Sequence, residues 1–376
     1  MRAHGSGEDG SGEDRLVDAH RRERALDRSY LKALAKQVEK LRDAGWRPVI
    51  VSSGAIACGL KELGIKERPT DMPSLQAAAS VGQSVLSTAY AEIFGARDIL
   101  TSVILLTRHD TANRHAYLHA RDTLERLVSL NVVPIVNEND TVSVEEIRFG
   151  DNDTLAALVA CLIKADLCVI FSDIDGLYTS NPQTDKDAQL LREVDFVSEA
   201  IMASAGGAGS KVGSGGMVTK IKAARVLMVA GIPLVVCHGR EPDALVRLTA
   251  GESVGTRFVA QRKPHEITPR KLWIALGDSA RGALVVDEGA KRALIGKGSS
   301  LLAVGIVRVE GVFAAGDVVD LKDSSDHVFA RGLVAGSSDE VSLARGRSQA
   351  EVDANKLLAN LAHRPIVHRD ELIVFE

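Results

Sequence analysis

The stretch VVPIVNEND at residues 132–140, followed by GDNDTLAALVACLIKA at residues 150–165, decides the fold class. The first run is short, apolar and rich in β-branched residues, so it predicts a buried strand, and the longer apolar run after GDND predicts a helix. Strands without polar alternation are typical of parallel sheets that are covered on both faces. The order of strand, polar turn and helix therefore indicates an α/β protein.

The same order recurs on both sides of this stretch. Apolar, β-branched runs predict further strands at residues 47–52, 99–106, 167–173 and 232–236, and periodic segments predict helices at 27–45, 113–130, 151–165 and 219–230. These elements predict a mainly parallel sheet sandwiched by helices. Ligands of such sheets bind beyond the carboxyl ends of the strands, where the turns converge.

The sequence changes character at residues 251–270, GESVGTRFVAQRKPHEITPR, which contain prolines and charges but little periodicity and are interpreted as a linker. Short glycine-bounded runs follow, among them KLWIAL, GALVV and HVFARGLV, and they predict a small β-barrel or sandwich up to about residue 346. We expect domains at 1–262 and 271–350, with a C-terminal tail at 351–376 that holds one helical piece and a short extended end.

Composition excludes several classes of protein. The 376 residues are 45% hydrophobic and 26% charged, which argues against a disordered chain, and the length is that of two or three domains. The net charge of −4 provides no positive field for nucleic acid or an anionic membrane. The N-terminus has no apolar stretch of signal-peptide length and no run is long enough to span a bilayer, so we expect a cytoplasmic protein without membrane contact.

Cysteine and histidine residues do not indicate a metal site. The four cysteines are far apart and form no Cys-x-x-Cys pair, so they are interpreted as buried, reduced thiols. His115 and His119 are four residues apart on an expected helix, but no acidic third ligand accompanies them, and a solvated helix face is the favoured interpretation.

Four turns after the expected strands carry small, acidic or amide residues. They are SSGA at 52–55, the pair NEND and GDND at 137–140 and 150–153, SDIDGLYT at 172–179, and the glycine-rich segment at 206–220. Asn and Asp side chains can hold an ammonium group or orient lysines around a phosphate. Lys220 opposes the dipole of the helix that it opens unless an anion compensates it, so the glycine-rich segment is interpreted as a phosphate cradle, although it lacks P-loop spacing. A plain helix cap for the first turn and a flexible linker for the last are the alternatives.

Several of these segments together resemble the glutamate 5-kinases of the amino acid kinase family. They are VIVSSGAIACGL, AAASVGQS, LLTRHD, ARDTLERL, VVPIVNENDTV, GDNDTLAALVA, SDIDGLYT and GSGGMVTKIKAA. VDEGAKRALI, GSSLLAVGI and GDVV resemble the PUA domain that follows many bacterial members. The resemblance implies an amino acid kinase-like fold with a PUA-like β-barrel. It also implies transfer of the γ-phosphoryl group of ATP to the side-chain carboxylate of L-glutamate, which opens proline biosynthesis.

The resemblance also implies roles for particular residues. Glutamate would be bound by Ser53, Asp140 and Asn152, and ATP by Ser172, Asp173, Ser214, Gly215, Gly216, Met217, Val218, Thr219 and Lys220. Lys220 would balance the transition-state charge, with Asp153 orienting it. A substrate carboxylate is its own nucleophile, so alignment and cancellation of charge by lysine, amides and Mg²⁺ bound with ATP are what the reaction requires. No metal ligands are expected from the protein.

The first 31 residues depart from the family. The resemblance implies an apolar strand and a Gly-Ser turn bearing a phosphate-contacting lysine, but this stretch has no lysine and no β-branched run. We expect either a start farther upstream or a weakened or inactive kinase homologue that acts as a regulatory or RNA-binding protein through the PUA-like module.

Further expectations concern partners. RNA binding is disfavoured, because residues 271–345 contain nine lysines and arginines against ten acidic residues. A kinase of the same fold that acts on a different small acid is another alternative. The resemblance also implies a homo-oligomer and feedback inhibition by proline.

Overall fold

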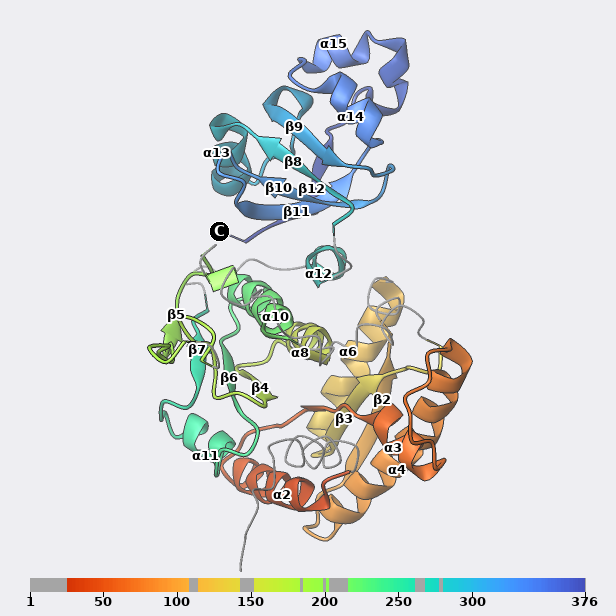
Figure 1. Ribbon diagram of the computed structural model, residues 1–376, viewed down its shortest axis with the longest axis vertical. Helices are drawn as coiled ribbons and strands as arrows, with labels where there is room; N and C mark the ends of the chain where they lie inside the picture. The colour runs from red at the N-terminus through yellow and green to blue at the C-terminus, as the bar shows by residue number, and fades with distance from the viewer. Residues whose placement is uncertain are drawn as a thin grey trace, which may run out of the picture. The chain divides into compact units, whose positions relative to one another are not determined.

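The computed structural model describes residues 26–107, 114–142, 152–182, 185–198, 201–202, 216–260, 268–276 and 280–375 (Figure 1). The chain divides into two compact units. The first contains the described residues of 1–107 and 126–150, and the second contains those of 108–125 and 151–376.

The first unit is built on a three-stranded parallel sheet. Its strand order is β1 (Ile50–Val51), β3 (Val133–Glu138) and β2 (Thr101–Leu106), and every residue of the central strand β3 is buried. The helices around it are α2 (Arg28–Asp43), α3 (Ala55–Glu62), α4 (Met72–Gly95) and the C-terminal end of α6 (Arg114–Ser129). Helix α2 begins at Asp27, whose carboxylate accepts hydrogen bonds from two backbone N–H groups of the first turn.

Helices α3 and α4 cross with their backbones in direct contact. A Cβ atom on Gly59 would lie 1.7 Å from the carbonyl oxygen of Ala78, and one on Gly82 would lie 1.7 Å from the carbonyl oxygen of Ala55. Both positions therefore require glycine. Gly54, the N-cap of α3, has a φ of +90°, in the left-handed region that glycine adopts without steric cost.

The second unit begins with a four-stranded sheet. Its order is β4 (Cys168–Ser172), β6 (Leu234–His238), β7 (Thr256–Phe258) and β5 (Glu193–Val194), and only the pair β6–β7 is antiparallel. Helices α8 (Asn152–Leu162) and α10 (Met217–Val229) pack against each other and on this sheet (Figure 1), and α11 (Ala244–Thr249) follows β6. The α/β architecture is confirmed. The strands that we expected in one sheet lie in two separate sheets, and no described strand connects β1 to β4.

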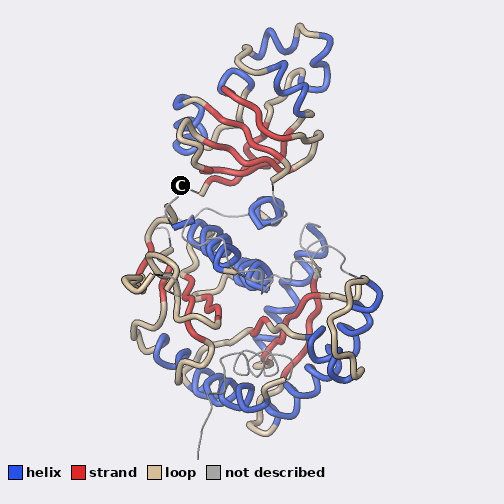
Figure 2. Tube along the Cα trace, viewed as in Figure 1, coloured by secondary structure: helices blue, strands red, loops and turns tan. Residues whose placement is uncertain are grey.

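The five-stranded C-terminal sheet has the order β12 (Val367–Val374), β11 (Val328–Val334), β10 (Val318–Lys322), β8 (Gly282–Val286) and β9 (Ile306–Gly311). Figure 2 shows its strands lying together, with helices at their margins. These helices are α13 (Glu288–Lys297), α14 (Ser338–Ala344) and α15 (Gln349–Asp353), with the 3-10 turns η1 (Ala303–Gly305) and η2 (Lys356–Leu361). The predicted strand-rich module is therefore confirmed, and it has its own buried core of aliphatic and phenylalanine side chains.

One predicted strand is a helix, and one long helix was not predicted. The run KLWIAL is not a strand but the core of helix α12 (Pro269–Leu276). A short apolar run does not distinguish the two structures; here Pro269 occupies the first helical position and the Thr268 hydroxyl accepts the N–H of Lys271. The 24-residue helix α4 was not predicted, because its alanines and serines give little periodicity. No helix among the described residues is long and apolar enough to cross a bilayer.

Candidate active site

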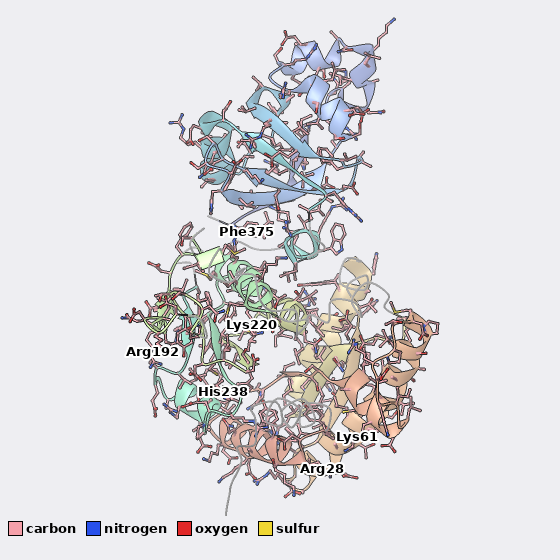
Figure 3. The ribbon with its side chains drawn as sticks, in the orientation of Figure 1. Arg28, Lys61, Arg192, Lys220, His238 and Phe375 are labelled. Carbon is pink, nitrogen blue, oxygen red and sulfur yellow. The ribbon has the colours of Figure 1, made fainter. Side chains whose placement is uncertain are left out.

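The centre of the candidate site is a buried ion pair between two helix starts. Asp153 lies in the first turn of α8, and Lys220 lies in the first turn of α10. The Lys220 Nζ atom is 3.1 Å from Asp153 Oδ2, and the two side chains are only 8% and 14% exposed. Figure 3 labels Lys220 on α10. In such a poorly solvated place each charge needs its partner, so the lysine is held in a fixed position.

The helix dipoles have opposite electrostatic effects on the two charges of this pair. A carboxylate is stabilised in the first turn of a helix, whereas a lysine is destabilised there. Asp153 is therefore favoured by α8 and supplies the anion that offsets the unfavourable position of Lys220 on α10. The Thr219 hydroxyl, 2.6 Å from Asp153 Oδ2, adds a second donor to the same carboxylate oxygen. The result is a cation at the amino end of a helix, which is a place where anions bind.

The start of α10 has no side-chain cap, and of its first amides the Thr219 N–H donates to the Gly216 carbonyl at 3.1 Å. Its N-cap is Gly216, which has no side chain to accept the N–H groups of the first turn. Met217, Val218 and Thr219 open the helix, which begins two residues before the predicted start at residue 219. The predicted ATP contacts Ser214 and Gly215, and the first half of GDND, lie outside the described residues.

Another group of predicted residues lies at the carboxyl ends of β4 and β6. Ser172 ends β4 and its hydroxyl donates to the carboxylate of the exposed residue Asp173, 3.1 Å away. The Ser172 carbonyl accepts the Gly239 N–H at 2.8 Å. Opposite Ser172 in the register is His238, which the sequence did not single out. Its Nδ1 accepts the Arg240 N–H at 3.0 Å, so the neutral ring carries its proton on Nε2.

The predicted glutamate-binding residues are divided between the units. Ser53 is exposed in the turn after β1, and Asp140 is half-buried just after β3, the neighbouring strand. The first turn is tied to β3 by the Ser52 N–H, which donates to the Val136 carbonyl at 2.8 Å. Asn152 begins α8 beside Asp153, in the second unit. The roles of these residues in binding stay predictions.

Supporting residues on α4 were missed by the sequence analysis. Asn137, the first residue of NEND, donates to Gln83 Oε1 at 2.9 Å and accepts the N–H of Glu138 through its own Oδ1. The hydroxyl oxygens of Ser52 and Tyr90 are 3.2 Å apart, and burial raises the pKa of Tyr90, so its phenol stays protonated. Gln83 lies within the quoted AAASVGQS, but only the fold brings it to Asn137.

The cysteines supply no nucleophile. All four are free; Cys58, Cys168 and Cys237 are buried and Cys161 is half-buried. Burial raises the pKa of the Cys161, Cys168 and Cys237 thiols to about 12, and it also raises that of Cys58 against the opposing charge of Lys61. Protonated thiols are poor nucleophiles. The predicted burial is therefore confirmed for Cys58, Cys168 and Cys237, and Cys161 is only half-buried.

Comparison with known proteins agrees with the resemblance seen in the sequence. The amino acid kinase family matches residues 13–238, and the PUA domain matches residues 282–355. The glutamate 5-kinase of Syntrophotalea carbinolica is 45% identical over 349 residues, which cover 93% of this chain and 92% of that protein. The glutamate 5-kinase of Gloeobacter violaceus is 46% identical over 91% of this chain and 92% of its own length, and that of Caldanaerobacter subterraneus is 42% identical over 93% of each. The chain therefore belongs to the amino acid kinase family, beside its glutamate 5-kinase relatives, and carries a C-terminal PUA domain.

Proposed function

We propose that this protein transfers the γ-phosphoryl group of ATP to the side-chain carboxylate of L-glutamate, giving glutamyl 5-phosphate and ADP in the first step of proline biosynthesis. The observation that carries the proposal is the buried Lys220–Asp153 pair at the amino ends of α8 and α10. The relatives named glutamate 5-kinase, which match over more than nine-tenths of the chain, support the choice of glutamate.

In this reaction a carboxylate oxygen of glutamate attacks the γ-phosphorus, and the bond from that phosphorus to the bridging oxygen of ADP breaks. Negative charge develops on the transferred group and on the leaving phosphate. Lys220 and the amides at the start of α10 stabilise that charge, and Asp153 with Thr219 holds the ammonium group in position. No protein nucleophile is needed, in keeping with the protonated thiols.

We assign the substrates to the residues that the sequence indicated. Glutamate would contact Ser53, Asp140 and Asn152, and ATP would contact Ser172, Asp173 and residues 214–220. Among the described residues no three His, Cys, Asp or Glu side chains cluster as a metal cage. Mg²⁺ takes most of its ligands from phosphates and water, so it would arrive with ATP and neutralise phosphate charge there.

The test is direct synthesis of the acyl phosphate. The full chain is incubated with ATP, Mg²⁺, L-glutamate and hydroxylamine, and the hydroxamate and ADP are measured together. Equal amounts of both products are expected with L-glutamate, and none with L-aspartate or N-acetylglutamate. Product with another acid in the panel, but not with glutamate, would assign a different substrate. No product with any acid would favour the inactive homologue.

The remaining expectations are proposals of the same kind. We propose a cytoplasmic homo-oligomer, inhibited by proline, with the kinase domain ending near residue 262. The PUA-like domain, expected at 271–350, would extend farther, because β12 belongs to its sheet. Adding proline to the hydroxamate assay tests inhibition, and light scattering tests the oligomer. A salt-dependent RNA shift would support the alternative of RNA binding through the PUA-like module.

A further inference from the structure

Helix α10 has a second contact besides the one at its amino end. Five residues separate Lys220 from Arg225, which in an α-helix is about 7.5 Å along the axis and about 140° around it. The two side chains therefore leave the helix in different directions. Lys220 meets Asp153 of α8, and Arg225 meets the C-terminal sheet, within the same unit of the chain.

Arg225 makes two contacts with that sheet. Its Nη2 donates a hydrogen bond of 2.8 Å to the carbonyl oxygen of Val328, the first residue of β11. Its guanidinium carbon lies 4.1 Å from the centre of the Phe375 ring, which is the geometry of a cation–π interaction. The Phe375 N–H in turn donates to the carbonyl of Phe329 at 2.9 Å, so the ring is fixed to β11 (Figure 3).

The surroundings of Arg225 belong to the same junction. The rings of Phe196, just after β5, and His327, just before β11, lie 6.4 Å apart. Together with Met228 of α10 and Phe375 they line a small cavity beside the guanidinium. Arg225 is half-buried at this junction.

Helix α12 also connects to the C-terminal sheet, but through a different arginine. Arg270 of α12 pairs with Glu371 of β12. This pair is largely exposed at the arginine, which is 59% exposed, and it does not involve α10. It therefore provides a matched comparison for Arg225, since it joins the same sheet to the rest of the unit.

We propose that Arg225 is a positioning residue: by fixing α10 to β11 and Phe375, it keeps Lys220 in place, so that the C-terminal sheet contributes to the rate of phosphoryl transfer. The inference rests on the proposed function for the role of Lys220. Its physical basis is that α10 is held at two points, at Lys220 by Asp153 and at Arg225 by the C-terminal sheet. A helix held at two points has less freedom to shift than a helix held at one.

The test compares Arg225→Met, Arg225→Lys, Phe375→Leu and Arg270→Gln in the full chain. Arg225→Met is expected to lower kcat about tenfold, the size of a coupling of 1.4 kcal/mol, with the KM for glutamate unchanged. Arg225→Lys keeps a cation over the ring and should recover part of the loss. Phe375→Leu removes the ring under the guanidinium and should also lower kcat. Arg270→Gln should leave kcat at the wild-type value.

Hydrogen exchange of the peptide spanning 217–229 gives a readout that does not depend on activity. Faster exchange is expected in Arg225→Met and Phe375→Leu, but not in Arg270→Gln. Wild-type kcat and wild-type exchange in Arg225→Met would overturn the proposal, as would an equal loss of kcat in Arg270→Gln. If the wild-type protein makes no hydroxamate, the proposed function fails, and the exchange of α10 alone decides whether Arg225 holds the helix.

Discussion

Among the residues that the structure describes, two buried lysine–aspartate pairs are alike in geometry and different in surroundings. Lys220 and Asp153 are 3.1 Å apart, and Lys291 and Asp323 of the C-terminal domain are 2.8 Å apart. The four side chains are all less than one-fifth exposed. Distance and burial alone would therefore assign both pairs the same role.

Their neighbours separate them. Asp323 also accepts the backbone N–H groups of Ser325 and His327, so its carboxylate closes a turn, and Lys291 lies 5.3 Å from the centre of the Phe329 ring. Lys291 and Lys220 are each the fourth residue of a helix, α13 and α10. The difference is that Asp153 also stands at a helix start and that the N-cap of α10 is a glycine with no side-chain acceptor, whereas Asp287 caps α13. Lys291 and Asp323 thus stabilise a turn, whereas for Lys220 and Asp153 we propose contact with an incoming anion.

The largest expected difference between the pairs is in catalysis. Lys220→Met should lower kcat in the hydroxamate assay about 10²–10³-fold, because it removes a donor to the developing charge. Lys291→Met, the matched control, should keep the wild-type kcat under conditions where it is folded. Equal losses in the two variants would show that the pairs do not differ in function.

Stability should separate the two pairs much less than catalysis does. Lys291→Met leaves the Asp323 charge without its ion-pair partner and should lower the unfolding free energy of the C-terminal domain by about 3 kcal/mol, as for other broken buried pairs. Lys220→Met should cost a similar amount, because each carboxylate keeps other partners: Asp153 keeps the Thr219 hydroxyl and the dipole of α8, and Asp323 keeps two backbone N–H groups. Urea titrations followed by hydrogen exchange of β10 and α8 peptides measure the two effects separately. A loss several times larger in one variant than in the other would contradict this expectation.

Acid should weaken the structural pair. Burial raises the pKa of Asp323, but the hydrogen bonds from Lys291, His327 and Ser325 outweigh it, and the net pKa lies below the usual 3.8. A depressed pKa stabilises the folded state above the unfolded value, and this contribution is lost as the pH falls through the folded pKa. The stability gap between wild type and Asp323→Asn in urea titrations should therefore be widest above about pH 4 and shrink in stronger acid. A gap that grows with acid would contradict this sign.

The smallest expected effect is at the second donor to Asp153. Thr219→Val removes one hydrogen bond to that carboxylate, worth about 1 kcal/mol, and should lower kcat about fivefold. Thr249→Val in α11 is the matched control, since its hydroxyl bonds only to carbonyls of its own helix. A wild-type kcat in Thr219→Val would show that Lys220 alone fixes Asp153.

The sequence predicted those elements whose signal lies within a few consecutive residues. The strands β2, β3, β4 and β6 are uninterrupted apolar runs, so their positions were predicted within two residues. The prediction of a strand at KLWIAL was wrong, because this run is too short to show helical periodicity. The helix-start signals of Thr268 and Pro269 were overlooked. In the site, the helix-start chemistry and the family resemblance indicated Lys220 and Asp153. The bond from Asn137 to Gln83 has no local mark, because its partners are 54 residues apart.

The crossing at Gly59 and Gly82 has a consequence for motion. Because the two backbones are in direct contact, without side chains between them that could change rotamer, we expect α3 and α4 to shift together. Ser53 lies just before α3. Gln83, which accepts a hydrogen bond from Asn137, follows Gly82 on α4. We therefore expect a displacement of the Ser53 turn to move Asn137 as well. A methyl group added at Gly59 or Gly82 would push the helices apart and displace both Ser53 and Asn137.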